Sequence, residues 1–118
     1  MRSGTCLLLC AALLCPAVHA DYEDGLAAAQ AGDYATALRE FTAAAEAGLD
    51  LAQYNLATMY ETGEGVAQDL VQAHFWASAA QYNEFADASG LLERLSAAMT
   101  QEQLAAARQA FAQWLLAL

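Results

Sequence analysis

Past residue 20, the chain has almost none of the residues that favour β-strands. Residues 21–118 contain two valines, no isoleucine and five threonines, whereas strands are built mainly from β-branched and aromatic side chains. Alanine is abundant instead, with runs at 27–29, 43–45 and 105–107, and it has the highest helix propensity of any residue. We therefore predict an all-α fold.

The predicted helices have recognisable ends. Asp50, Asp69 and Thr100 each stand three residues before a Gln, a spacing typical of the capping box, in which both side chains bind free backbone N–H groups. Three glycines stand where a left-handed residue would close a helix: Gly32, Gly48 and Gly63. Together these signals predict helices over Tyr22–Ala31, Tyr34–Ala47, Leu51–Thr62, Leu70–Tyr82, Glu84–Ala98 and Gln101–Ala117.

The connections between these helices are short, so we expect three antiparallel helical hairpins. Apolar residues recur at steps of three and four, for example at Tyr34, Leu38 and Phe41, which indicates helices with one buried face. The helix over 70–82 is different, because apolar side chains cover most of its surface. Such a helix is buried on several sides, and we place it at the centre of the fold.

The sequence repeats with a period of 36 residues. A shift by this period superposes residues at predicted helix starts and residues of the predicted buried faces. The matched pairs are Asp33 and Asp69, Ala37 and Ala73, Ala43 and Ala79, Ala44 and Ala80, Ala52 and Ala88, and Leu56 and Leu92. A fixed period in this range indicates a solenoid of helical hairpins, in which each unit buries its apolar face against the next unit.

The most specific stretch is Asp50–Asp69, which reads DLAQYNLATMYETGEGVAQD and is followed by Val71, Gln72, Ala73 and Trp76. It resembles a Sel-one-like repeat, a relative of the tetratricopeptide repeat with a longer loop between its two helices. The preceding unit is similar to a plain tetratricopeptide hairpin, on the residues Gly25, Gly32, Asp33, Tyr34, Ala37, Leu38, Phe41 and Ala44.

This resemblance implies a fold and a function. The fold is a short right-handed α-solenoid of antiparallel helical hairpins with about six helices, with a full repeat over about 48–83 and a capping helix over 101–117. Repeats of this family generally serve as interaction scaffolds. The implied function is therefore a non-catalytic module that binds another protein or a peptide in a concave groove.

Residues 1–20 have the layout of a secretory signal peptide. Arg2 gives a basic start, an apolar stretch follows, and the segment ends with the small residue Ala20. We predict cleavage after Ala20, export to the periplasm or outside the cell, and a helical-repeat domain over 21–118. The alternatives are an uncleaved anchor and a lipoprotein modified at Cys15. All three cysteines lie before Ala20, so the mature chain has no thiol to mispair in an oxidising compartment.

The predicted mature chain is strongly acidic. It carries three arginines and no lysine against fourteen Asp and Glu residues, a net charge of −11. This balance argues against a nucleic-acid partner and repels anionic lipid, so we predict neither nucleic-acid binding nor stable membrane insertion after cleavage. The acidic residues also lack the regular ligand spacing of a calcium loop, and we predict no metal and no cofactor.

A catalytic site has few residues to draw on. His74 is the only histidine in 21–118, and Ser78 lies one helical turn away, so a nucleophile–base pair would need these two residues. We predict no catalytic residue and no enzymatic activity. Two alternatives stay open: a small envelope-associated hydrolase that uses His74, and a structural subunit that forms a homodimer through the apolar segment Phe111–Leu118.

The candidate binding surface lies on the predicted helix over 51–62. Tyr54, Thr58 and Glu61 follow the i, i+4, i+7 spacing of one helix face, and that face lines the groove in similar repeat proteins. Gln53 and Asn55 flank it. We predict that these five residues line a protein-binding groove. The alternative for Tyr54 is that it packs against a neighbouring helix.

Overall fold

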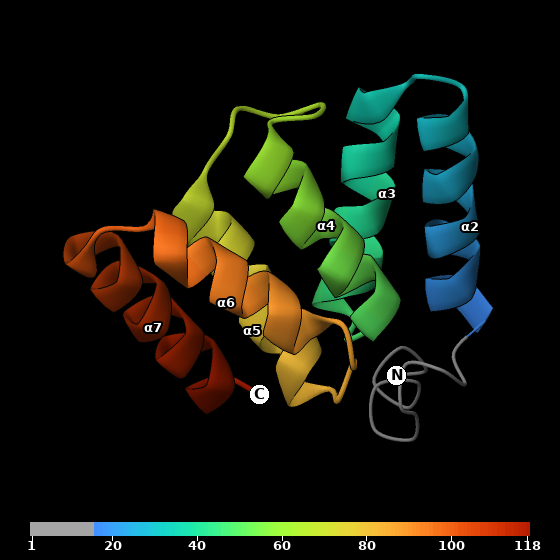
Figure 1. The fold of residues 1–118 in the computed structure, drawn as a ribbon. Coiled ribbons are helices and arrows are strands. Elements are labelled where there is room, and N and C mark those ends of the chain that lie inside the picture. Colours follow the sequence, from blue (N-terminus) through green and yellow to red (C-terminus); the bar gives the residue numbers. More distant parts are fainter. Residues whose placement is uncertain (1–15) are drawn as a thin grey trace.

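The structure, a computed structural model, describes residues 16–118. This part of the chain contains six α-helices and no strand (Figure 1), which confirms the all-α prediction. The helices are α2 (Pro16–Gln30), α3 (Tyr34–Glu46), α4 (Asp50–Thr62), α5 (Leu70–Tyr82), α6 (Ala88–Ala98) and α7 (Gln101–Leu116). Residues 1–15, most of the predicted signal peptide, lie outside the described residues.

The first four helices form two stacked hairpins. In Figure 1, α2 and α3 run antiparallel, α4 and α5 do the same, and α3 packs against α4 to join the two hairpins. This is the solenoid-like arrangement that the period of 36 residues predicts. α5 lies at the centre, in contact with α4, α6 and α7, as expected for a helix that is apolar on most of its surface.

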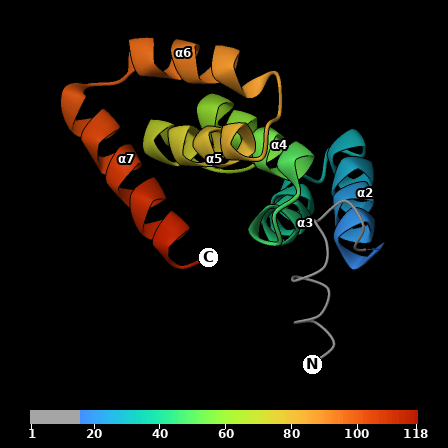
Figure 2. The same ribbon diagram turned by 90° about the horizontal axis from the view of Figure 1, so that it is seen from below.

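The prediction of a third hairpin is wrong. α6 and α7 diverge from their connection, and α5 lies between them (Figure 2). Both helices pack against α5 instead of along each other, because the apolar surface of α5 offers contacts on more than one side. The ring of Phe75 in α5 lies 6.2 Å from that of Phe111 and 5.9 Å from that of Trp114, both in α7.

Alanine fills much of the space between the helices. Because alanine has no atoms beyond Cβ, two helices that meet through alanines approach closely. The alanines without exposed surface are Ala37, Ala44, Ala45, Ala52, Ala57, Ala73, Ala77, Ala79, Ala80, Ala88 and Ala107. The largest fully buried aliphatic side chains of the described chain are those of Leu49, Leu56, Leu91 and Leu95. The core is therefore made of many small side chains around a few leucines.

Asp33 and Asp69, at equivalent positions of the repeat, cap α3 and α5 in the same way. Asp33 Oδ1 accepts a hydrogen bond from the backbone N–H of Thr36 at 3.2 Å, and Asp69 Oδ1 accepts one from the backbone N–H of Gln72 at 3.1 Å. The repeat is thus present in the local structure as well as in the sequence.

The two other capping predictions have opposite outcomes. Thr100 and Gln103 form the full capping box: Thr100 Oγ1 accepts from the Gln103 N–H at 3.1 Å, and Gln103 Oε1 accepts from the Thr100 N–H at 2.9 Å. Asp50 does not cap α4. Leu49 holds the N-cap position without a side-chain bond, and Asp50 Oδ1 accepts from the N–H of Leu51 at 2.7 Å.

Two further helix starts differ from the prediction by several residues. α2 is already helical at Pro16, the first residue that the structure describes, and no residue from there to Tyr22 breaks the helix. It crosses the predicted cleavage point after Ala20, and Val18 is buried in the core. α6 begins at Ala88 and not at Glu84, because Glu84 has a φ of 66°. That left-handed conformation cannot continue a right-handed helix.

Two glycines are required by close contacts between elements. A Cβ at Gly25 of α2 would lie 2.7 Å from the ring of Phe41 in α3, so this helix crossing needs a residue without a side chain. Gly65, in the loop between α4 and α5, has a φ of 78°, and a Cβ there would lie 2.6 Å from Tyr34 Cβ. The predicted left-handed glycines are confirmed, with φ of 82° at Gly32, 102° at Gly48 and 77° at Gly63.

We expect Gly65→Ala to lower the free energy of unfolding more than Gly32→Ala does. Gly32 is left-handed but surrounded by open space, so its substitution carries only the conformational cost of about 1–2 kcal/mol. Gly65→Ala adds the collision with Tyr34. Gly90→Ala is the control: Gly90 lies within α6 with open space around it, and its replacement should stabilise by about 0.5–1 kcal/mol. Urea denaturation followed by circular dichroism measures all three. Equal losses at Gly32 and Gly65 would contradict the contact with Tyr34.

Candidate functional site

Gln53, one of the five predicted groove residues, lies in the core. It has no exposed surface. Its Nε2 donates to the carbonyl oxygen of Ala45 at 3.1 Å, and its Oε1 accepts from Asn83 Nδ2 at 2.9 Å. Gln53 therefore joins α4 to the end of α3 and to the end of α5. The expectation that it flanks a binding groove is corrected, because a partner cannot reach it.

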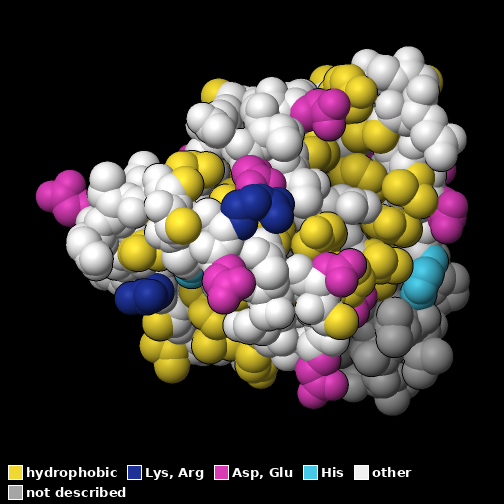
Figure 3. Space-filling model, in the orientation of Figure 1, with side chains coloured by type: hydrophobic (Ala, Val, Ile, Leu, Met, Phe, Trp, Pro, Cys, Tyr) yellow, Lys and Arg dark blue, Asp and Glu magenta, His cyan; other side chains and the backbone are white. Residues whose placement is uncertain are grey.

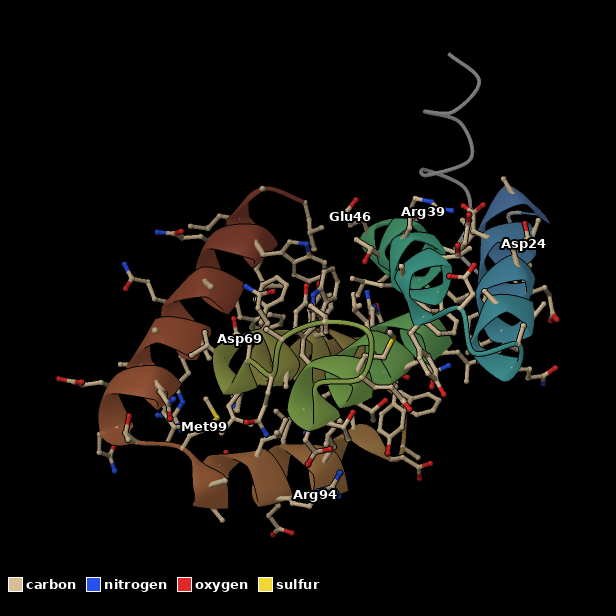
Figure 4. The ribbon with its side chains drawn as sticks, turned by 90° about the horizontal axis from the view of Figure 1, so that it is seen from above. Asp24, Arg39, Glu46, Asp69, Arg94 and Met99 are labelled. Atoms are coloured by element: carbon tan, nitrogen blue, oxygen red, sulfur yellow. The ribbon has the colours of Figure 1, made fainter. Side chains whose placement is uncertain are left out.

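Tyr54 and Glu61 face the α6 side of the molecule. The rings of Tyr54 and Phe85 lie 5.0 Å apart, so Tyr54 packs against the segment that connects α5 to α6. The alternative for Tyr54 placed it against a neighbouring helix, whereas its partner lies just before one. The Glu61 carboxylate accepts from Arg94 Nε at 2.8 Å and from Arg94 Nη2 at 2.9 Å. This guanidinium of α6 (labelled in Figure 4) holds the pKa of the Glu61 carboxyl below its ordinary value.

Asn55 and Thr58 lie at a cavity between α2, α3 and α4. Its volume is about 200 Å³. The residues that line it, which define the α2–α4 cavity, are Leu26, Ala29, Tyr34, Phe41, Asn55, Thr58, Met59 and Glu64. The structure thus brings two of the five predicted residues to one surface feature and distributes the other three elsewhere.

The polar groups of the α2–α4 cavity are partly engaged with each other. Asn55 Nδ2 donates to the hydroxyl oxygen of Tyr22 at 3.1 Å, and this hydrogen bond joins α4 to α2. Thr58 Oγ1 donates to the backbone carbonyl oxygen of Asn55 at 2.8 Å. Within residues 16–118, the Glu64 carboxylate forms no ion pair. The cavity therefore combines apolar walls with hydrogen-bond acceptors and one unpaired acid.

The face that holds α2, α3 and α4 is rich in hydrophobic side chains, with acidic side chains at its margins (Figure 3). Leu26 and Ala29 of α2 contribute to the cavity, and the sequence analysis did not identify them. Tyr22, Leu26 and Ala29 follow the same i, i+4, i+7 spacing that drew attention to α4. This spacing can be seen in the sequence, but it indicates a cavity wall only once α2 is known to lie beside α4.

His74 and Ser78 lie on α5, on the side that faces α7. His74 is 6% exposed, and its Nδ1 lies 3.4 Å from Ser78 Oγ. In the described part of the chain no carboxylate contacts this pair, and residues 16–118 contain no group of three or more His, Cys, Asp or Glu side chains placed to hold a metal ion. A buried pair without an orienting third group gives no support to the hydrolase alternative.

Burial, and after it the charge of Arg108 on α7, holds the pKa of His74 below its ordinary value of 6.5. As the pH falls below that value, the unfolded chain binds a proton at His74 while the folded chain leaves the ring neutral. The free energy of unfolding must then decrease with falling pH, until the folded form also binds the proton.

We therefore expect a pH-dependent loss of stability that His74→Gln removes. Urea denaturation over a pH series from about 5 to 8 measures it in the wild type and the variant. Arg108→Gln should reduce the loss, because it deletes one of the two causes of the pKa shift. Parallel pH profiles for the wild type and His74→Gln would contradict this account.

A second cavity, of about 470 Å³, lies where the end of α7 approaches the connection between α3 and α4. Glu46 stands at its edge (labelled in Figure 4). Large apolar side chains are exposed beside it, with exposed fractions of 55% for Tyr82, 87% for Leu116 and 72% for Leu118. With Trp114, which lines the cavity, these three residues form what we term the apolar end.

Comparisons with known proteins do not assign the chain to a family. No model of a protein family matches it, and no curated protein matches it. Among the described residues, every helix is too short or too polar to cross a membrane.

Proposed function

We propose that the protein is a non-catalytic interaction module of the Sel-one-like type, which binds a protein or peptide at the α2–α4 cavity without a cofactor. The observation that supports this most directly is the composition of the cavity, which is lined by helices of two successive hairpins. Stacked helical hairpins create binding surfaces in this way. The resemblance of residues 50–76 to a Sel-one-like repeat points to the same function.

We also propose export to the periplasm, or outside the cell, after cleavage following Ala20. The support is the sequence layout: a basic start, an apolar stretch and a small residue at the cleavage point. Cleavage would remove Val18 from the core, but the part of α2 that follows would keep the contacts of Tyr22 and Gly25 with Phe41.

A photoreactive residue next to the cavity tests the interaction in intact cells. Thr62 suits this purpose, because it is exposed and its hydroxyl donates to the carbonyl oxygen of Thr58, one turn earlier on α4. A probe there borders the cavity without filling it. We expect cross-linked adducts at position 62 and none at Gln109, an exposed position of α7.

Two matched alanine substitutions locate the site. Ala29 lines the cavity, whereas Ala27 is exposed on the same helix. Ala29→Phe should fill the cavity and abolish the adducts at position 62, and Ala27→Phe should leave them unchanged. Circular dichroism melts check that both variants fold. Adducts that survive in a folded Ala29→Phe variant would refute the binding site.

A second candidate function is a structural subunit that forms a homodimer through the apolar end. It is favoured by the exposure of Leu116 and Leu118 and by the absence of charged side chains from residues 109–118. Residues 21–118 carry a net charge of −11, so this domain repels a second copy least where it carries no charge.

Sedimentation velocity over a range of protein concentrations tests this candidate. Dimerisation through the apolar end predicts a sedimentation coefficient that rises with concentration, and Leu116→Glu with Leu118→Glu should abolish the rise. The pair Ala105→Glu with Ala106→Glu adds the same charge to exposed positions of α7 outside residues 109–118 and serves as the control. A concentration-independent monomer would eliminate this function.

A further inference from the structure

The α2–α4 cavity has the size and walls to hold one apolar side chain. An apolar cavity of about 150 Å³ accommodates benzene, and the α2–α4 cavity measures about 200 Å³. Leu26, Ala29 and Phe41 give it rigid apolar walls, and Met59 adds a flexible one, since a methionine thioether adapts its shape to what it contacts. A single aliphatic or aromatic side chain of a partner therefore fits.

Among the residues that line the cavity, Glu64 alone carries a charge. The Glu64 carboxylate lines the cavity and has no cationic partner within residues 16–118. The Thr58 hydroxyl has already used its hydrogen to reach the Asn55 carbonyl, so its oxygen can only accept a further bond. A group that approaches here meets the negative charge of Glu64, which favours a cation and disfavours a carboxylate.

The arginines of the described chain do not offset this negative charge. Arg94 is held by Glu61 on the α6 side, Arg39 lies 3.9 Å from Glu40 on α3, and Arg108 acts on His74 at α7. None of the three lines the cavity. A second copy of this chain is consequently a poor source of the required cation. It has no lysine, and its arginines in the described region lie beside Glu61, Glu40 and His74.

On these grounds, and resting on the function proposed above, we infer that the partner presents an extended segment in which a large apolar side chain stands next to Lys or Arg. The apolar side chain enters the cavity between Leu26, Phe41 and Met59. The neighbouring cation pairs with Glu64 at the edge. The net charge of the domain adds long-range attraction for a basic segment.

A phage-displayed library of random linear peptides, selected on the purified protein, tests this inference. Counter-selection on the Ala29→Phe variant removes peptides that bind elsewhere. We expect the selected peptides to share an apolar residue with Lys or Arg beside it. Selected peptides with Asp or Glu beside the apolar residue, or with no charge preference, would overturn the inference, as would a failure to enrich any peptide.

Charge variants then test the role of Glu64. A selected peptide, made synthetically with a fluorescent label, is titrated by anisotropy. Glu64→Gln should weaken binding about two- to fivefold, as expected for an exposed ion pair, and added salt should reduce the difference. Glu93→Gln, which removes an exposed acid on α6, is the control and should leave the affinity unchanged. Equal effects of both variants would show only a general charge effect and refute a pairing at Glu64.

The inference and the proposed function fail in different ways. If cross-linking at position 62 depends on Ala29 while the selected peptides are not basic, the interaction module stands and the basic partner is wrong. If Ala29→Phe changes neither cross-linking nor peptide binding, the α2–α4 cavity is not the binding site and both are wrong.

Discussion

Close approach of helices through alanine is the constraint on which this fold depends. The alanines without exposed surface lie on α3, α4, α5, α6 and α7, so most helix contacts involve at least one face without bulky side chains. Such faces bury little apolar area for each residue, and the fold compensates by surrounding α5 with three other helices. The aromatic cluster of Phe75, Phe111 and Trp114 then attaches α7, in which Ala107 is the one alanine without exposed surface.

Sequence reasoning succeeded where the physical cause is local. Asp33, Asp69 and Thr100 bind N–H groups three residues away, and Gly63 takes the left-handed conformation that ends α4. These outcomes depend only on the backbone nearby. The prediction that Asp50 caps α4 was wrong for the opposite reason, because the cause is not local. Leu49 is fully buried, and this tertiary contact sets the direction in which the chain enters the helix.

The candidate site was only partly predictable, because it depends on how helices distant in sequence are arranged. Thr58 was identified from the spacing along α4, and Asn55 as a residue that flanks the same face; both line the cavity. Whether Gln53 points to solvent or to Ala45 and Asn83 depends on the crossing of α3, α4 and α5, which no periodicity within one helix specifies. The same holds for Glu61, whose partner Arg94 is 33 residues away. The spacing of residues along one helix predicts which side chains share a face. The packing of the other helices determines whether that face is buried or exposed.

The placement of the few arginines determines which negative charges stay available. Arg94 of α6 pairs with Glu61 of α4, whereas Glu64, three residues later, forms no ion pair within residues 16–118 and lines the α2–α4 cavity. Because like charges disfavour the wrong partner as much as opposite charges favour the right one, an acidic edge excludes acidic segments, even those whose apolar side chain would fit between Leu26 and Met59.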